Sequence, residues 1–312
     1  MTEASTATSL APGLSVTVEV SATSANLGPG FDCFGLALGW RESVQLDVIA
    51  SGYEIDVTGE GADVLPRDES HLILRSALTG LADLGLSIPG LRLSGHNTIP
   101  HGRGLGSSSA AIVAGLLAAQ GLSGSTIDQR WVLRHADAIE GHPDNVAAAV
   151  YGGFVLAYSG VEGVAVAQGS LAPDLGAVLF VPEEPVATHL ARGLVPEQVP
   201  HRDAAANSGR AALLVHALAH EPELLWEATR DWLHQDYRAK AMPHSYQLMT
   251  ALRQQGLAAT ISGAGPTVIV LGRVDALAGL QTPAPGFRRV ATGLGTAARV
   301  SESNAPVTKT NR

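Results

Sequence analysis

A run of small apolar residues behind a glycine-rich bend constrains this chain more than any other stretch. Residues 100–119 read PHGRGLGSSSAAIVAGLLAA. Glycine permits backbone conformations that other residues rarely adopt, serine is common where helices begin, and alanine and leucine favour helix. The stretch therefore predicts a bend that leads into a helix with apolar side chains on all sides, and such a helix must be buried.

The start of this predicted helix is a candidate anion site. The free N–H groups of a first helical turn attract phosphate, and the helix dipole strengthens the attraction. The serine hydroxyls at 107–109 could also donate to phosphate or bind Mg²⁺. No lysine follows the glycines, as a P-loop requires, and their spacing does not fit G-x-G-x-x-G. A serine-capped helix without a ligand is the alternative interpretation.

Composition excludes several classes of protein. The 312 residues carry a formal net charge of −9, which argues against a nucleic-acid partner. No apolar stretch reaches the roughly 18 residues of a membrane span, so no membrane partner is expected. The lone cysteine, Cys33, cannot form an intramolecular disulfide, which favours a reducing, cytoplasmic location. We read Cys33 as a small buried hydrophobe, and a homodimer is left open.

Apolar periodicity predicts an α+β protein in two lobes. Strand-like and helix-like segments alternate without a regular βαβ period. We expect a helix in residues 70–86 capped by Ser70, a helix at 223–233 and a strand at 257–272. The expected N-terminal domain covers residues 14–165 and the C-terminal domain 166–303, with flexible tails at 1–13 and 304–312.

Three motifs, in the same order, resemble the GHMP kinase superfamily. Residues 100–110 are similar to its phosphate loop, VSATSANLGPGFDCFGLAL (20–38) to its N-terminal motif, and ISGAGPTVIVL (261–271) to its C-terminal glycine motif. The resemblance implies an N-terminal lobe like ribosomal protein S5 domain 2, a ferredoxin-like C-terminal lobe, and ATP with Mg²⁺ between them. It implies the following ATP or phosphate contacts: Pro100, His101, Gly102, Arg103, Gly104, Leu105, Gly106, Ser107, Ser108, Ser109, Ala110, Gly263 and Gly265.

A fourth stretch, EGHPDNVAAAVYGGF (140–154), resembles the homoserine kinases of that superfamily. The resemblance implies ATP-dependent phosphorylation of the L-homoserine hydroxyl, a step toward threonine. It implies that Glu140 holds Mg²⁺ together with Ser108. Related kinases use an aspartate base nearby, so two alternatives stay open: Asn145 orients the acceptor hydroxyl without a base, or Asp144 is the base.

The substrate would be a free amino acid, which needs a partner for its ammonium group and another for its carboxylate. Asp32 is the natural ammonium partner, and arginine suits the carboxylate. On the family's motifs the expected substrate contacts are Asn26, Asp32, His142, Thr188, Arg192 and Arg238. His71 stands where the family often has asparagine near the adenine, so the adenine contacts stay open. The rival interpretations are a mevalonate- or sugar-type kinase and a non-catalytic metabolite-binding relative.

Overall fold

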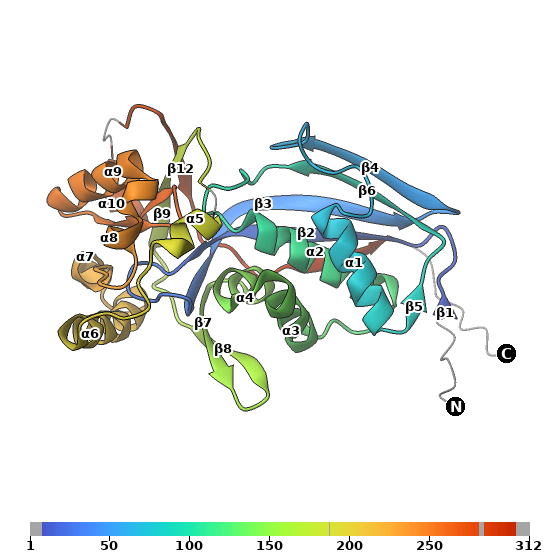
Figure 1. Ribbon diagram of the computed structural model, residues 1–312, viewed down its shortest axis with the longest axis horizontal. Helices are drawn as coiled ribbons and strands as arrows, with labels where there is room; N and C mark the ends of the chain where they lie inside the picture. Colours follow the sequence, from blue (N-terminus) through green and yellow to red (C-terminus); the bar gives the residue numbers. More distant parts are fainter. Residues whose placement is uncertain (1–7, 187, 281–283, 304–312) are drawn as a thin grey trace.

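Two β-sheets, each covered by helices, form the two lobes of the molecule (Figure 1). The computed structural model describes residues 8–186, 188–280 and 284–303. The first sheet has seven strands, and neighbouring strands are antiparallel except for β4 and β6. Its central order is β13 (Arg299–Ser303), β2 (Ser15–Ala25), β3 (Phe34–Val48), β6 (Gly90–Asn97) and β4 (Gly52–Gly59), with β7 (Phe154–Gly160) on β3 and β8 (Gly163–Gly169) on β7.

Helices α1 (Leu72–Asp83), α2 (Ser107–Leu122), α3 (Gln129–Glu140) and α4 (Pro143–Tyr151) lie along one face of this sheet (Figure 1). Most side chains of α2 are buried, among α1, α3, α4 and β2. The helix can approach α1 closely because Gly115 has no Cβ, which would lie 2.4 Å from the carbonyl oxygen of Ile73. The predicted buried helix behind the glycine bend is therefore confirmed.

The second lobe contains a four-stranded antiparallel sheet in the order β10 (Ala258–Ile261), β11 (Val268–Arg273), β9 (Leu175–Pro182) and β12 (Phe287–Thr292). Alternating apolar residues of β9, β10 and β11 pack into a core with residues of α9. The helices of this lobe are α5 (Thr188–Gly193), α6 (His201–Ala219), α7 (Leu225–Ala228), α8 (Gln235–Arg238), α9 (Pro243–Gln254) and α10 (Val274–Ala278). The expected α+β fold in two lobes is confirmed.

Two expected helices have different starts or ends. Ser70 does not cap α1, because its N–H and hydroxyl both donate to the side chain of Asp68. The expected helix at 223–233 is broken, and only Leu225–Ala228 is α-helical. Beyond it, the Asp231 carboxylate accepts hydrogen bonds from the N–H groups of residues 233–235, which competes with a continued helix.

The expected strand at 257–272 is two strands with a loop between them. β10 ends at Ile261 and β11 begins at Val268. In the loop, Gly263 and Gly265 have φ of 58° and 86°, which a strand does not allow. The interruption falls within the glycine motif, whose loop turns toward the other lobe.

The chain crosses between the lobes twice. It passes from the first sheet to the second between β8 and β9. It returns at the end of the described chain, where β13 pairs with β2 in the first sheet. The division expected at residue 165/166 stays a prediction. Part of the expected N-terminal tail is ordered, because Thr8–Ser9 pairs with Leu86–Ser87 and Leu10 is buried; the expected tail residues 1–7 and 304–312 lie outside the described residues. Within the described ranges, no helix is long and apolar enough to cross a membrane.

Candidate active site

Three segments that are distant in the sequence are held together at the junction of the lobes. The hydroxyl of Ser262 donates to the carbonyl oxygen of Gly104 at 2.6 Å, which ties the C-terminal glycine motif to the bend before α2. The amide nitrogen of Asn26 donates to the carbonyl oxygen of Gly263 at 2.9 Å, and the Gly263 N–H donates to Ala25. The three motifs predicted to act together are therefore in direct contact.

The bend before α2 requires glycine. Gly102, Gly104 and Gly106 have φ of 65°, 70° and 68°, in the left-handed region. A Cβ on Gly104 would lie 2.3 Å from the carbonyl oxygen of Ser262. Gly106 is the N-cap of α2, and no side chain caps the helix. The serines at 107–109 are thus in the first turn, where their N–H groups are available to an anion.

Glu140 at the end of α3 accepts hydrogen bonds from two of these serine hydroxyls. Ser108 donates to one carboxylate oxygen at 2.7 Å and Ser109 to the other at 2.9 Å. One carboxylate with nearby hydroxyls is a hard-oxygen donor set of the kind that Mg²⁺ uses beside phosphate. The predicted partners Ser108 and Glu140 are in contact, and their donor atoms fit that ion.

The first turn of α4 carries the predicted catalytic pair. The buried carboxylate of Asp144 accepts a hydrogen bond from the N–H of Asn145 at 2.7 Å and also contacts His142 Nδ1 at 3.2 Å. The hydrogen bond to Asp144 raises the pKa of His142. The side chain of Asn145 is held instead by Thr23 of β2, whose hydroxyl donates to Oδ1 at 2.7 Å.

The two groups expected to bind opposite ends of an amino acid are paired with each other. Arg192 of α5 donates to both carboxylate oxygens of Asp32, at 3.1 and 2.8 Å. Both side chains are 35% exposed, so the pair is accessible to solvent and to a ligand. Asp32 adopts φ of 53°, in a turn held by the bond from its N–H to Asn26.

Arg238 lies nearby and is 1% exposed. Its guanidinium donates to the carbonyl oxygens of Ala191 and Gly263 and contacts His234. No carboxylate of the described residues forms an ion pair with it. Burial first, and then the nearby charge of Arg192, lower the pKa of Arg238 to about 10. This is a buried cation that no carboxylate of the described residues contacts directly, although the charges of Asp32, Asp231 and Asp144 act on it; such a cation favours binding of an anion.

A cavity of about 110 Å³ lies between these groups, and a second of about 200 Å³ adjoins it. The two share Gly102, Ser107 and Ser108 in their linings. The second cavity is partly apolar, and both ring nitrogens of its buried His71 lack a hydrogen-bond partner among the described residues. It also contains Glu42. The first cavity is lined as follows: Ala25, Asn26, Gly102, Gly104, Leu105, Gly106, Ser107, Ser108, Glu140, His142, Asp144, Asn145, Arg192, Arg238, Gly263 and Ala264.

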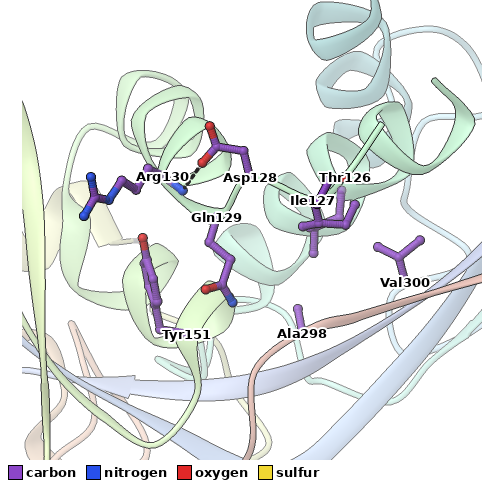
Figure 2. Close-up of a pocket in the computed structure, with 9 residues that line it drawn as sticks. Thr126, Ile127, Asp128, Gln129, Arg130, Tyr151, Ala298 and Val300 are labelled. Carbon is purple, nitrogen blue, oxygen red and sulfur yellow. Dashed lines mark hydrogen bonds between the residues drawn. The ribbon is translucent and has the colours of Figure 1, made fainter. Parts of the chain in front are cut away.

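A larger cavity, about 670 Å³, lies elsewhere, between the start of α3, Tyr151 and β13 (Figure 2). Its acidic group, Asp128, accepts from the N–H groups of Arg130 and Trp131 and so caps α3. Gln129 donates to the carbonyl oxygen of Val150. These contacts serve the fold, and none of the predicted site residues lines this cavity, so it is not our candidate.

Several predicted residues have other partners. The Arg103 guanidinium donates to the carbonyl oxygens of His101, Pro182 and Glu183, so it ties the bend to the second lobe. Pro100 and Ala110 are buried in the fold. The amide of Asn26 is engaged at both ends, by Gly263 and by Asp32. The side chain of Thr188 lies outside the described residues.

Two residues of the site were not predicted. Thr23 lies inside the N-terminal motif, but no pattern indicates that its hydroxyl reaches Asn145, 122 residues away. Glu42 lies in β3 in an alternating segment, RESVQL, where a charge is ordinarily exposed. Glu42 is 7% exposed, and burial raises its pKa to about 7. Weak hydrogen bonds from the N–H groups of Ile99 and Thr98 lower the pKa, but by less than burial raises it.

Known proteins are similar to this chain over most of its length. The GHMP kinases N terminal domain matches residues 71–153, and the GHMP kinases C terminal domain matches residues 212–279. The chain is 52% identical over 273 residues to the homoserine kinase of Streptomyces coelicolor, covering 85% of this chain and 88% of that one. It is 54% identical over 261 residues to the homoserine kinase of Streptomyces avermitilis, covering 82% and 85%. The crystal structure of homoserine kinase from Cytophaga hutchinsonii superposes with a TM-score of 0.80 at 27% identity, covering 92% of this chain and 97% of that one.

Proposed function

This chain belongs to the GHMP kinase family, and from that premise we propose how its residues phosphorylate L-homoserine with ATP. The side-chain oxygen of homoserine bonds to the γ-phosphorus of ATP while the bond to ADP breaks. Such a transfer depends mainly on positioning and on neutralising phosphate charge. Each of these requirements has a candidate group in the two adjoining cavities.

The observation that carries the choice of substrate is the buried Arg238, which forms no direct ion pair among the described residues, beside the Asp32–Arg192 pair. A homoserine zwitterion brings one carboxylate and one ammonium group. Its carboxylate would bind Arg238 and Arg192, and its ammonium group would bind Asp32, replacing Arg192 there. A neutral sugar would leave the Arg238 cation unpaired, and mevalonate has no ammonium group for Asp32. The charges therefore favour an amino acid over the other substrates of this family.

The first turn of α2 would bind the phosphates through the N–H groups of residues 107–109, because no side chain caps that turn. Ser108 and Glu140 would hold Mg²⁺, since their oxygens already converge there. When bound, that ion would neutralise charge on the triphosphate. The base of ATP would enter the adjoining cavity of about 200 Å³, where the buried ring of His71 has unpartnered nitrogens.

Asn145 is our choice for the group that orients the acceptor hydroxyl. The carboxylate of Asp144 is engaged by the N–H of Asn145 and by His142, which fits a role in holding the start of α4. Because the transition state is loose, it asks little of a base. A folded, ATP-binding Asp144→Asn variant without turnover, beside an active Asn145→Ala variant, would reverse this assignment.

The test is a coupled assay of ADP release with Arg238→Gln. We expect turnover with L-homoserine and little with mevalonate, galactose, 4-hydroxybutyrate or 3-aminopropanol. The substitution should raise KM for homoserine roughly 10- to 100-fold, since a hydrogen bond to a charged group contributes about 1.5–3 kcal/mol. KM for ATP should stay unchanged.

Arg253→Gln is the control, because Arg253 is a partly buried arginine that donates to Thr229, Ala259 and Trp226 away from the cavity. An equal change in KM for homoserine in both variants would mean that packing, and not carboxylate binding, explains the effect. Absence of ADP release with homoserine by the folded chain would overturn the whole assignment. A cytoplasmic location remains part of the proposal, supported by the lone Cys33.

A further inference from the structure

Thr23 is a fully buried residue of β2 that lies between the glycine bend and Asn145. Its hydroxyl donates to Asn145 Oδ1 at 2.7 Å, and its N–H donates to the carbonyl oxygen of Leu105 in the bend. A Cβ on Gly106 would lie 1.9 Å from the same hydroxyl, so the third glycine of the bend leaves room for it. One side chain thus links the phosphate loop, the sheet and α4.

This contact determines which end of the Asn145 amide is free. Oδ1 faces Thr23 and Gly106, being 3.2 Å from the position of a Cβ on Gly106. Nδ2 lies on the other side, 3.9 Å from the position of a Cβ on Gly263, which also lines the cavity. Because the Thr23 hydroxyl donates its proton to Oδ1, both N–H bonds of Nδ2 are available to other partners.

We propose that Thr23 is a positioning residue, which fixes the Asn145 amide so that Nδ2 donates to the oxygen of the acceptor hydroxyl. The inference rests on the proposed role of Asn145. A donor at that place holds the oxygen in line with the phosphorus and leaves a lone pair for the new O–P bond. An amide nitrogen cannot accept the hydroxyl proton, which passes to an oxygen of the transferred phosphoryl group as the bond to ADP breaks.

The experiment compares Thr23→Val, which keeps the shape and removes the hydroxyl, with Thr23→Ser, which keeps the hydroxyl. We expect Thr23→Val to lower kcat about tenfold, the upper range for one neutral hydrogen bond, with KM for ATP and homoserine within about twofold of the parent value. Thr23→Ser should restore most of the rate. In an Asn145→Ala background, Thr23→Val should have no further effect, because the two side chains act as a unit.

Thr267→Val is the matched control, since Thr267 is also fully buried and its hydroxyl has no partner among the described residues. It should leave kcat unchanged. An equal loss in Thr267→Val, an unrestored rate in Thr23→Ser, or a full loss from Thr23→Val in the Asn145→Ala background would each overturn the proposal. If Asn145→Ala alone keeps the parent kcat, the proposed role of Asn145 fails as well; if Asn145→Ala is slow while Thr23→Val is normal, only the role of Thr23 fails.

Discussion

Glu42 is a carboxylic acid in the wall of the cavity that we assign to the base of ATP. It forms no ion pair within the described part of the chain, and two backbone N–H groups approach it only at 3.4 Å. Burial raises its pKa from 4.5 to about 7. Ionising Glu42 therefore opposes folding, since a buried charge without a partner is unfavourable.

The sign of the pH dependence follows. Between about pH 4.5 and 7 the folded chain binds this proton more tightly than the unfolded chain, so the contribution of Glu42 to stability falls as pH rises through that window. Above pH 7 the loss is complete, at about 3 kcal/mol. Glu42→Gln should thus be more stable than the parent at pH 8, and the difference should shrink toward zero near pH 4. Urea unfolding at both pH values measures this, and a gain that does not depend on pH would contradict it.

Residues whose chemistry is local could be predicted from the sequence, and others could not. Glu140 ends a helix within a motif that resembles the homoserine kinases, and Ser108 lies in the glycine-serine stretch, so the resemblance implied their pairing. Thr23 and Glu42 acquire their roles only from burial and from partners distant in the chain. Ser70 does not cap the helix as expected, because its hydroxyl donates a hydrogen bond to Asp68, two residues earlier.

At the scale of elements, the bend and α2 work as one unit. The three left-handed glycines turn the chain so that α2 starts without a side-chain cap. The buried helix itself was predictable from its alanines and leucines. The split of residues 257–272 into β10 and β11 was missed, because apolar residues on both sides of the loop suggested one continuous strand.

Gly106→Ala tests this unit. The alanine would have to adopt the left-handed φ of 68°, and its Cβ would lie 1.9 Å from the Thr23 hydroxyl oxygen. The bend must therefore shift. We expect kcat/KM for ATP to fall at least about tenfold, or about 1.4 kcal/mol. Gly85→Ala is the control, with φ of 70° and open space around it. Both should lose about 1–2 kcal/mol of stability from the backbone conformation, but only Gly106→Ala should lose activity; normal kinetics in Gly106→Ala would refute the coupling.

At the scale of the whole molecule, the return of the chain to the first lobe ties the two halves together. After β12, Gly293 accepts from the N–H of Gly39, and Thr296 and Ala297 accept from the Arg41 guanidinium. β13 then pairs with β2 and completes that edge of the sheet. The two-lobed fold was predictable from the alternation of elements. The return to the first lobe was not, because the sequence of a short terminal strand does not indicate which strand it pairs with.

Removing residues 299–312 should therefore destabilise the first lobe, although those residues follow the second in sequence. The shortened chain loses the β13 ladder and the packing of Val300 against the core. Full burial of a valine contributes about 1.5–3 kcal/mol, and the lower end applies because Val300 is only partly buried. With about 2–4 °C per kcal/mol we expect Tm to fall roughly 3–6 °C. A chain without 304–312 alone is the control. Equal Tm values for the two shortened chains would show that β13 contributes nothing.

The Asp32–Arg192 pair has a consequence for which metabolites the proposed site admits. Binding of a zwitterion would leave the net charge of the site unchanged. Arg192 and Asp32 would separate, and each would gain one charged group of the ligand as its new partner. A simple carboxylate that bound Arg192 as well as Arg238 would leave Asp32 without its partner, and a simple amine that bound Asp32 would leave Arg192 without one. The proposed site should therefore favour a zwitterion over simple organic acids and amines. Because no net charge is gained or lost, the affinity for homoserine should respond only weakly to ionic strength.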